Sequence, residues 1–443
     1  MLRPKVAGID LGSRSMYVAG PPLADGTPEV IEFGTTTEQI LQCGNWLRER
    51  EVASVAMEST GVYWIPVLEI LESAGFEVLL VDSRPLARVP GRKTDVLDCQ
   101  WIQTLHSCGL LKGCYRPAEQ ISQLRTLARN KAVLVAEQSD WLRRMHKVMD
   151  EMNVRVHHAV SDVQGTTGMA IIRAIDAGER DPKKLAALRD PRCRHSEQQI
   201  AEFLTGNWRS DHLFNLRQGL KVYDSMEERL AEYEREIQRR LQDLTPPERE
   251  ADTAPPLPNR ERMKAFKRRK QEGHRHQLYR MVGADLTSID GIGVETAEVI
   301  VSEYGADLSK FPTERAFVKH VGLAPRQNIT GGKPVRKRGK GKPRSTRTAQ
   351  ALRNAATALR ISRTALGAQY RRIARGKGPG VAVFVTARKL ATLVYRLLRF
   401  GQAYADEGQK AYEERFQAAR LRATMANAAQ LGYQLVKTPA VNP

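Results

Sequence analysis

The chain has 443 residues, of which 41% are hydrophobic, and its 70 lysines and arginines against 50 acidic residues give a formal net charge of +20. This length and apolar content allow two or three folded domains and exclude a chain that is disordered throughout. The excess of positive charge favours a polyanionic partner, because cations displace the counterions condensed on phosphate backbones.

Residues 1–116 alternate between short apolar runs and helix-like stretches, which predicts an α/β domain. Three apolar runs come first (KVAGI, MYVAG and EVIEF), close enough to pair as antiparallel strands through short turns. Two further strands, VASVAME and FEVLLVD, then alternate with three helical stretches, the last of which is TDVLDCQWIQTLHSCG. This order of strands and helices is that of an RNase H-like (RuvC-like) fold.

Residues 117–250 are predicted to be a helical, coiled-coil region. Apolar residues from Ile121 to Met149 form a stripe that predicts one long helix over about 117–152. A second stripe, from Leu216 to Leu244, recurs at alternating threes and fours over about four heptads, which is coiled-coil spacing. It fits a helix packed on its own chain as well as a dimer interface, and residues 153–215 between the stripes carry no pattern that predicts their structure.

A proline-rich stretch and the basic segment RERMKAFKRRKQEGHRHQ predict a linker over residues 251–284. A second, mainly helical globular domain is expected over residues 285–405, followed by a helical tail over residues 406–443. The chain therefore divides into two globular domains, joined by the helical region and the linker.

Four carboxylates fall where an apolar strand ends or a helix begins. Asp10 lies in the first strand, Glu58 ends the fourth, and Asp95 and Asp98 open the last helix of the domain on one helical face. In an RNase H-like sheet the first and fourth strands are neighbours, so the four acids would meet in one pocket. Oxygen ligands favour Mg²⁺ or Mn²⁺, and a pair of such ions supports in-line phosphoryl transfer.

These acids have alternative interpretations. Asp95 and Asp98 taken alone fit favourable charges at the positive end of a helix. The segment GIDLG also opens actin-like and sugar-kinase ATPases, but the second glycine-rich phosphate loop that such a chain requires is not found. The metal site is the interpretation that accounts for all four carboxylates.

The segment LTSIDGIGVETAEVIVSEYG is typical of a helix-hairpin-helix, in which amides after Gly291 and Gly293 face a phosphate. The alternative is a tight turn that uses glycine for its backbone freedom. Farther on, a segment rich in glycine and proline predicts a basic loop that contacts phosphates, although a solvated arm has the same composition. Its cations are Lys333, Arg336, Lys337, Arg338, Lys340, Lys342, Arg344 and Arg347.

No apolar run is long enough to span a bilayer, and the first ten residues lack the apolar region of a signal peptide. We therefore expect a cytoplasmic protein with no membrane partner. The five cysteines are irregularly spaced without a C-x-x-C pair, which predicts reduced thiols and neither a disulfide framework nor a structural zinc site.

The D…E…D-x-x-D set, followed by SIDGIGVETA, HVGLAPRQNITGGK and ARKLATLVYRLLRFG, resembles the DEDD transposases of bacterial insertion sequences, the bridge-RNA-guided recombinases. The resemblance covers both terminal domains and the order of all motifs. It implies a RuvC-like domain joined by a coiled coil to a smaller transposase domain. It also implies a tetramer built from dimers, a structured noncoding guide RNA that pairs with donor and target DNA, and a nucleoid-associated location in a bacterial cell.

The resemblance also implies the catalytic residues. The carboxylates are Asp10, Glu58, Asp95 and Asp98, and they combine with a hydroxyl residue of another subunit to form a covalent enzyme–DNA intermediate. The family nucleophile is a serine before glycine, and in GLAPRQNITGGK that place is held by Thr330. Threonine in place of serine departs from the family pattern. Threonine can serve as a nucleophile, but its extra methyl group crowds an in-line attack.

Other residues near Thr330 complete the predicted site. Ser345 and Thr346, beyond the basic loop, are the fallback nucleophiles, and Arg326 and Lys333 are candidates to stabilise the pentacoordinate charge. Without the resemblance, Thr330 is read as a turn residue that hydrogen-bonds its own backbone.

Three functions are therefore considered. The first is an RNA-guided, Mg²⁺-dependent DNA transposase or recombinase that forms a covalent intermediate. The second is a RuvC-like nuclease that uses water and leaves no protein on the DNA. The third is a non-catalytic nucleic-acid-binding protein, in which substitution of the carboxylates leaves every activity intact.

Overall fold

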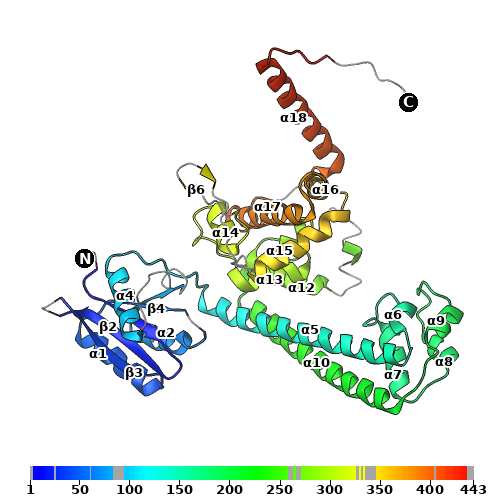
Figure 1. The fold of residues 1–443 in the computed structure, drawn as a ribbon, viewed down its shortest axis with the longest axis horizontal. Helices are drawn as coiled ribbons and strands as arrows, with labels where there is room; N and C mark the ends of the chain where they lie inside the picture. Colours follow the sequence, from blue (N-terminus) through cyan, green and yellow to red (C-terminus); the bar gives the residue numbers. More distant parts are fainter. Residues whose placement is uncertain are drawn as a thin grey trace. The chain divides into compact units, whose positions relative to one another are not determined.

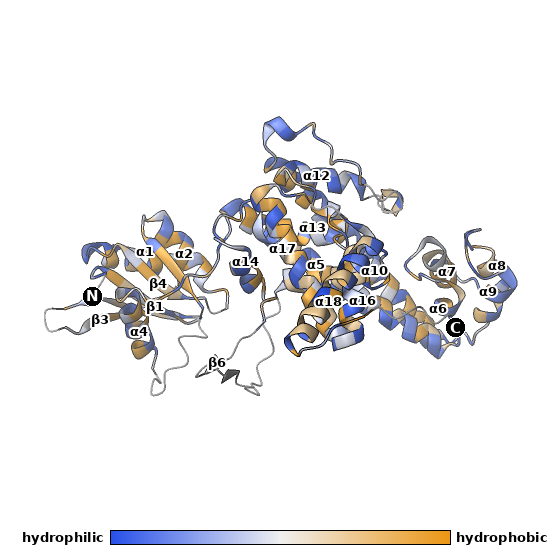
Figure 2. Ribbon diagram, turned by 90° about the horizontal axis from the view of Figure 1, so that it is seen from above, coloured by the Kyte–Doolittle hydropathy of each residue, from blue (hydrophilic) through white to orange (hydrophobic). Residues whose placement is uncertain are grey.

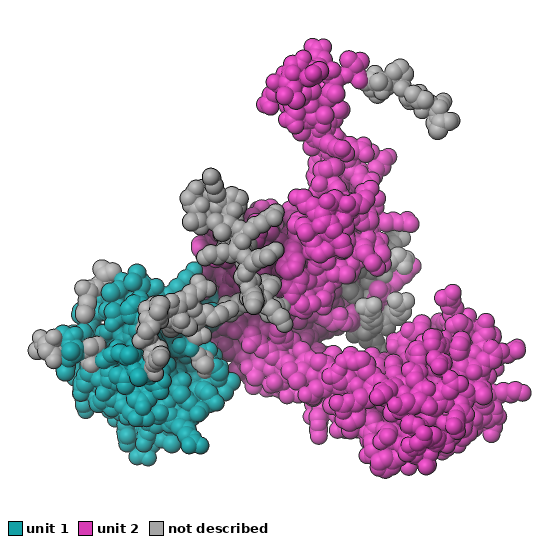
Figure 3. Space-filling model, viewed as in Figure 1, with its two compact units in different colours: residues 1–116 teal, residues 117–443 magenta. Residues whose placement is uncertain are grey.

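The structure is a computed structural model that describes residues 3–23, 26–59, 61–82, 94–257, 263–265, 271–325, 329–330, 333–334, 346–403 and 406–436. Residues 28, 329–330 and 333–334 are described by their backbone alone. The chain divides into two compact units, residues 1–116 and residues 117–443 (Figure 3). Within the described ranges, no helix combines the length and apolar character needed to cross a membrane.

The first unit is built on a five-stranded sheet with strand order β3-β2-β1-β4-β5. The strand β1 is antiparallel to β2 and parallel to β4, while β3 pairs with β2 and β5 with β4 at the two edges. The prediction of a mixed α/β domain whose first and fourth strands are neighbours is confirmed. The strands are β1 Val6–Leu11, β2 Ser15–Pro22, β3 Pro28–Gly34, β4 Ser54–Glu58 and β5 Glu77–Val81, and the helices are α1 Thr37–Glu49, α2 Trp64–Ser73 and α4 Asp95–Ser107.

The two faces of this sheet have different coverings, because alternate residues of a strand point to opposite sides. Ile9 and Met57 belong to the core shared with α1 and α2, and β4 is hydrophobic between its polar ends, Ser54 and Glu58 (Figure 2). The other face is covered by α4, where Ala56 packs with Ile102. Asp10 and Glu58 share the periodicity of the α4 face, so both acids are directed to the side on which α4 begins.

The second unit begins with a long helical hairpin. Helices α5 Glu119–Glu151 and α10 Ser210–Asp243 lie side by side (Figure 1). At Gly219 an added Cβ would lie 2.7 Å from the Cγ of Met145, so the two helices are in close contact. The predicted stripe on α10 therefore packs against α5 of its own chain, and its use as a dimer interface stays a prediction.

Between these helices lies a group of short helices, which we call the inserted helical body (residues 154–209). It consists of α6 Val156–Ala159, α7 Thr166–Asp176, α8 Pro182–Ala186 and α9 Glu197–Phe203. These helices share a buried core that includes Ile171 and Ile172 and that also contains Met149 of α5 and Leu216 of α10. The inserted helical body is thus anchored at the end of the hairpin where α5 stops and α10 starts.

The rest of the second unit is a bundle in which α17 packs against α14, α15 and α16. The bundle is joined to α5 through α13, because Glu303 accepts hydrogen bonds from Arg129 at 2.9 and 2.8 Å. The elements are α12 Glu272–Val282, α13 Val294–Tyr304, α14 Glu314–Val321, β6 Ile329–Thr330, β7 Lys333–Pro334, α15 Arg347–Ala358, α16 Ala365–Lys377, α17 Pro379–Phe400 and α18 Gly408–Gln430, with 3₁₀ turns η1 Pro247–Arg249, η2 Leu286–Ser288 and η3 Leu359–Ile361.

Candidate active site

Asp10 and Glu58 are brought side by side by the parallel pairing of β1 and β4. Ile9 is the partner of Met57 in this register, so the next residue of each strand, Asp10 and Glu58, stands at the same level of the sheet. Both side chains are half-buried. Two carboxylates thus lie at neighbouring carboxyl ends of strands, as the element order predicted.

Helix α4 brings the other two acids to the same place. It lies so close to β1 that a Cβ on Gly8 would come within 2.3 Å of the amide nitrogen of Gln103 and 2.5 Å of the carbonyl oxygen of Cys99. Asp95 and Asp98 occupy its first turn, and the N-cap is Thr94, whose side chain accepts a hydrogen bond from the Leu97 amide. Since Thr94 provides the cap, neither carboxylate is needed for that purpose.

The charges of the four acids are coupled. Burial raises the pKa of Asp10 to about 6, and the negative charges of Glu58, Asp95 and Asp98 add to the increase. A carboxylate that is desolvated and surrounded by like charges is unstable in its ionised form unless a cation neutralises it. The four side chains therefore form one electrostatic cluster, although they come from three separate segments of the sequence.

The donor chemistry of this cluster fits a hard divalent cation. Its donors are carboxylate oxygens, which Mg²⁺ and Mn²⁺ prefer. Burial, together with the charge of Asp10, raises the pKa of the adjacent Cys99 thiol to about 12, so a thiolate ligand is not available at neutral pH. As the side chains stand, no three acidic, histidine or cysteine residues in the described part of the chain converge on one ion position.

We expect this cluster to make the folding stability depend on pH when divalent cations are removed. The pKa of Asp10 is about 6 in the folded chain against an ordinary value of 3.8, so between these values the folded chain holds a proton that the unfolded chain releases. Folding stability from this group is therefore lost as the pH rises from about 4 to about 6. Calorimetry in chelator should show the transition temperature of the wild type falling relative to that of Asp10→Asn over this range. If the difference in transition temperature between the wild type and Asp10→Asn did not change with pH, the coupling among the four acids would be contradicted.

Two residues next to the cluster were not anticipated from the sequence. Tyr17 is the partner of Asp10 across β1 and β2, and Glu32 is the partner of Tyr17 across β2 and β3. A hydrogen bond to Glu32 is the main cause that raises the pKa of the Tyr17 phenol, and the charge of Asp95 adds to it. Residues at the same level of neighbouring strands lie on one face, so Tyr17 stands beside Asp10 on the α4 side of the sheet.

The predicted nucleophile lies in the second unit. Thr330 ends β6 and pairs with Lys333 of the antiparallel strand β7, and the structure describes the backbone of both residues. Arg347, also predicted for this loop, is instead the first residue of α15, where its guanidinium donates to the carbonyl oxygen of Ala128 at 3.1 Å. The remaining residues predicted for the loop lie outside the described part of the chain. They are Arg326, Arg336, Lys337, Arg338, Lys340, Lys342, Arg344 and Ser345.

Thr346, one of the fallback nucleophiles, has a structural role. It is the N-cap of α15, and its Oγ1 accepts a hydrogen bond from the Ala349 amide at 3.0 Å. The same hydroxyl donates to the carbonyl oxygen of Val321 at 2.7 Å. Since both interactions hold this hydroxyl in place, we set Thr346 aside as a nucleophile.

The predicted hairpin is packed against its own unit. Gly291 has a φ of 88°, and a Cβ there would lie 2.9 Å from the Cγ of Leu359. Glycine is thus required at this position by both backbone conformation and space. The segment before the hairpin is the 3₁₀ turn η2, and Gly293 is the N-cap of α13. Phosphate contact at Gly293 stays a prediction.

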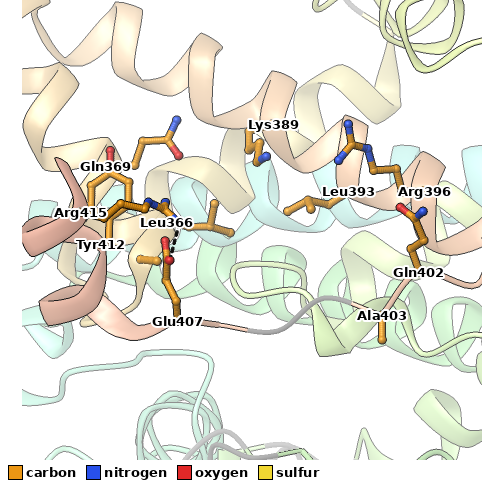
Figure 4. A pocket seen from close by; sticks show the side chains of 11 residues that line it. Leu366, Gln369, Lys389, Leu393, Arg396, Gln402, Ala403, Glu407, Tyr412 and Arg415 are labelled. Carbon is orange, nitrogen blue, oxygen red and sulfur yellow. Dashed lines mark hydrogen bonds and ion pairs between the residues drawn. The ribbon is translucent and has the colours of Figure 1, made fainter. Parts of the chain in front are cut away.

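A basic cavity of about 390 Å³ lies between α16, α17 and the start of α18 (Figure 4). Lys389 and Arg396 reach it from α17, within the stretch ARKLATLVYRLLRFG. Arg396 donates to Glu314 at 2.7 Å, and Arg415 of α18 is paired with Glu407. Cationic side chains of this kind contact the phosphates of nucleic acids.

A sheet that places two acids at adjacent strand ends, with two more at the start of the covering helix, defines a DEDD-type phosphoryl-transfer domain. Residues 7–154 match the transposase family model for the DEDD domain of IS110 elements, and residues 283–371 match the model of the transposase IS116/IS110/IS902 family. The chain belongs to the IS110-type transposases. No curated protein matches the chain.

This membership confirms the resemblance to DEDD transposases of insertion sequences. An IS110-type transposase acts on DNA, which it cleaves and recombines, and its DEDD domain depends on a divalent metal. The match at residues 7–154 covers all four predicted carboxylates, and the match at residues 283–371 covers Gly291, Gly293 and Thr330. Residues 155–282 lie outside both matches.

Proposed function

We propose that the chain is an RNA-guided, Mg²⁺-dependent DNA recombinase that cleaves and exchanges strands through a covalent threonine–DNA intermediate. The observation that carries this proposal is the convergence of four carboxylates, with Asp10 and Glu58 at adjacent strand ends and Asp95 and Asp98 in the first turn of the covering helix, because such a cluster needs a cation to be stable when ionised. The pKa of Asp10, which burial and the neighbouring charges raise to about 6, agrees with this. A tetramer built from dimers, with a structured guide RNA that pairs with donor and target DNA, completes the proposal and rests on the family resemblance.

In this mechanism the four carboxylates hold the metal, and Mg²⁺, or Mn²⁺ in its place, supplies Lewis-acid polarisation of the scissile phosphate when bound. The Oγ of Thr330 from another subunit attacks the phosphorus in line. A new P–O bond forms to Thr330, whose hydroxyl proton passes to solvent water. One P–O bond of the DNA breaks, and the leaving oxygen takes up a proton from solvent and ends as a hydroxyl. Arg326 and Lys333 stabilise the negative charge of the pentacoordinate phosphorus.

We expect a covalent protein–DNA adduct that depends on Thr330. The wild type, incubated with its native RNA, Mg²⁺ and end-labelled junction DNA and then denatured, should yield DNA bound to protein. Thr330→Ala should abolish the adduct because the attacking oxygen is removed. Thr330→Ser should retain it, since serine keeps the hydroxyl and removes the methyl group that crowds the attack. The adduct is measured by its retarded migration on a denaturing gel and by peptide mapping.

The other outcomes separate the competing functions. An adduct that survives Thr330→Ala and maps to Ser345 moves the nucleophile to that residue. Cleavage without an adduct in the wild type favours the water-using nuclease. Binding of DNA with neither cleavage nor adduct, unchanged by substitution of the carboxylates, favours the non-catalytic protein.

Tyr17 is proposed as a positioning residue for the DNA strand at the carboxylate cluster. In this proposal the strand that reaches Asp10 passes over the neighbouring β2, where the phenol of Tyr17 is hydrogen-bonded to Glu32. We expect Tyr17→Ala to raise the KM for DNA about tenfold, the magnitude of one lost stacking contact, with a smaller effect on kcat. Tyr17→Phe, which keeps the ring, should have an intermediate KM. Equal losses of kcat in both variants would instead indicate a role in the chemical step.

A further inference from the structure

The inserted helical body carries a pocket that no family match covers. The pocket has a volume of about 530 Å³ and lies between α6, the start of α7 and the loop that precedes α9. Histidine and arginine side chains from two of these segments line it. They are His157 and His158 from α6 and Arg192, Arg194 and His195 from the loop.

The rings at this pocket form a connected series. His157 and His158 are 4.2 Å apart between ring centroids, and Phe203 lies 5.9 Å from His158 and 5.8 Å from His195. Phe203 thus stands between the histidines of α6 and the histidine of the loop. This arrangement fixes flat, partly exposed rings on two sides of one cavity.

The loop that carries the arginines is held in a defined conformation. Its Asp190 amide donates to the Oγ1 of the buried Thr167 at 3.0 Å, and Arg189 donates to the carbonyl oxygen of His195 at 2.7 Å. Arg192 binds both carboxylate oxygens of Asp190 at 2.9 and 2.8 Å and holds the pKa of that carboxyl well below its ordinary value. The pocket wall is therefore preorganised.

Two aspartates and two arginines line the pocket. Asp190 and Arg192 form a neutral pair, while the carboxylate of Asp162 keeps its negative charge and accepts a hydrogen bond from the Gln164 amide at 3.0 Å. Arg194 is exposed, and among the described residues none forms a hydrogen bond or an ion pair with its guanidinium. Its positive charge is thus available to an external anion.

Metal binding does not explain this constellation. The three histidines and Cys193 all line the pocket, yet no three ligand side chains in the described ranges are arranged to hold an ion. Flat rings next to an available guanidinium are instead the combination that binds unpaired nucleotides, because bases stack on rings and arginine pairs with the phosphate.

We propose that this pocket binds an unpaired segment of a nucleic acid strand. Bases stack on His158 and His195, and Arg194 pairs with a backbone phosphate of the same segment. The site is separate from the carboxylate cluster, so it does not depend on the recombinase mechanism. Binding here gives the chain a second nucleic-acid contact, with single-stranded loops or ends, in addition to the proposed cleavage site.

Photocrosslinking with the full chain tests the proposal. Single-stranded RNA and DNA oligonucleotides of mixed sequence that carry photoreactive thio-bases are irradiated with the protein in chelator, which prevents cleavage, and adducts are mapped by mass spectrometry. We expect adducts at the peptides that contain His158 and His195. Arg194→Ala should reduce their yield at subsaturating oligonucleotide about tenfold, and the double variant His158→Ala/His195→Ala should abolish them.

The matched control is Lys184→Ala, which removes one positive charge from the same body at a position that does not line the pocket. Its adduct yield should equal that of the wild type. Adducts with RNA, with DNA or with both support the proposal and identify the strand. Adducts that map only outside residues 154–209, or that Arg194→Ala and Lys184→Ala reduce equally, overturn it. Because chelator stops catalysis, neither result depends on whether Thr330 forms a covalent intermediate.

Discussion

Asp10→Asn is expected to lower the rate of DNA strand cleavage by about a hundred- to a thousandfold. Asparagine keeps the size of the side chain but removes the charge of Asp10, a half-buried carboxylate that all three other acids influence. The loss of one carboxylate ligand weakens the binding of the cation that stabilises charge on the phosphorus, and single losses of such stabilisation cost 10² to 10³ in rate. The rate is measured on labelled junction DNA under single-turnover conditions.

A control distinguishes this effect from a general loss of negative charge. Glu38 lies in the first turn of α1, as Asp95 does in α4, and is exposed. Glu38→Gln should cleave at the wild-type rate. Asp10→Asn should remain folded. In chelator above pH 6 it should be more stable than the wild type, because the charge repulsion at position 10 is gone. Wild-type cleavage by a folded Asp10→Asn protein would refute the metal site.

Gly8→Ala is expected to destabilise the first unit by about 3 kcal/mol, at the upper end of the usual cost of overpacking. The added methyl group would meet backbone atoms of α4 at 2.3, 2.5 and 2.8 Å, which no rotation of a side chain can relieve. The helix would have to move away from β1, and Asp95 and Asp98 would move with it. Loss of stability should therefore be accompanied by loss of cleavage.

Gly44→Ala in the same unit is the matched control. Gly44 lies inside α1, and the nearest atom to an added Cβ is 3.7 Å away on Leu71, an ordinary contact. Alanine is favoured over glycine in a helix, so this variant should be neutral or up to about 1 kcal/mol more stable. Urea denaturation followed by circular dichroism measures both variants. Equal stabilities for Gly8→Ala and Gly44→Ala would contradict the close packing of α4 on β1.

The sequence was sufficient to predict the carboxylate cluster because its geometry depends on element order. Once β1 and β4 are parallel neighbours, Asp10 and Glu58 both lie at the carboxyl edge of the sheet, whatever the lengths of the intervening loops, and the register of the pair makes them adjacent. The position of Asp98 follows from its place one turn after the start of α4. These relations are properties of a parallel sheet and a helix, so they could be inferred without coordinates.

Tyr17 could not be found in the same way. Its place beside Asp10 depends on the register of the antiparallel pair β1 and β2, which the turn between Gly12 and Arg14 determines. A shift of one residue would direct Tyr17 to the opposite face of the sheet. The alternation in SMYVAG was the available signal, but the antiparallel pairing was predicted without assigning its register.

The inserted helical body escaped prediction for a different reason. Its helices have 4, 11, 5 and 7 residues, so most of them are too short to display a helical repeat of apolar positions. Its core is completed by Met149 and Leu216, which belong to the ends of the flanking long helices. The pocket it carries joins residues about 40 positions apart, and such a meeting is visible only after folding.

The hairpin of α5 and α10 fixes the distance between the helical bundle and the inserted helical body in the second unit. Near its base Ile121 touches Gly305 beside the helical bundle, and near its tip Met149 enters the core of the inserted helical body. At 1.5 Å per residue, these two positions on α5 are separated by about 40 Å. A nucleic acid held at both ends would have to bridge roughly a dozen base pairs, at 3.4 Å for each pair. Under our proposal for the pocket, the hairpin would set the distance between the bound unpaired segment and a nucleic-acid contact at the bundle.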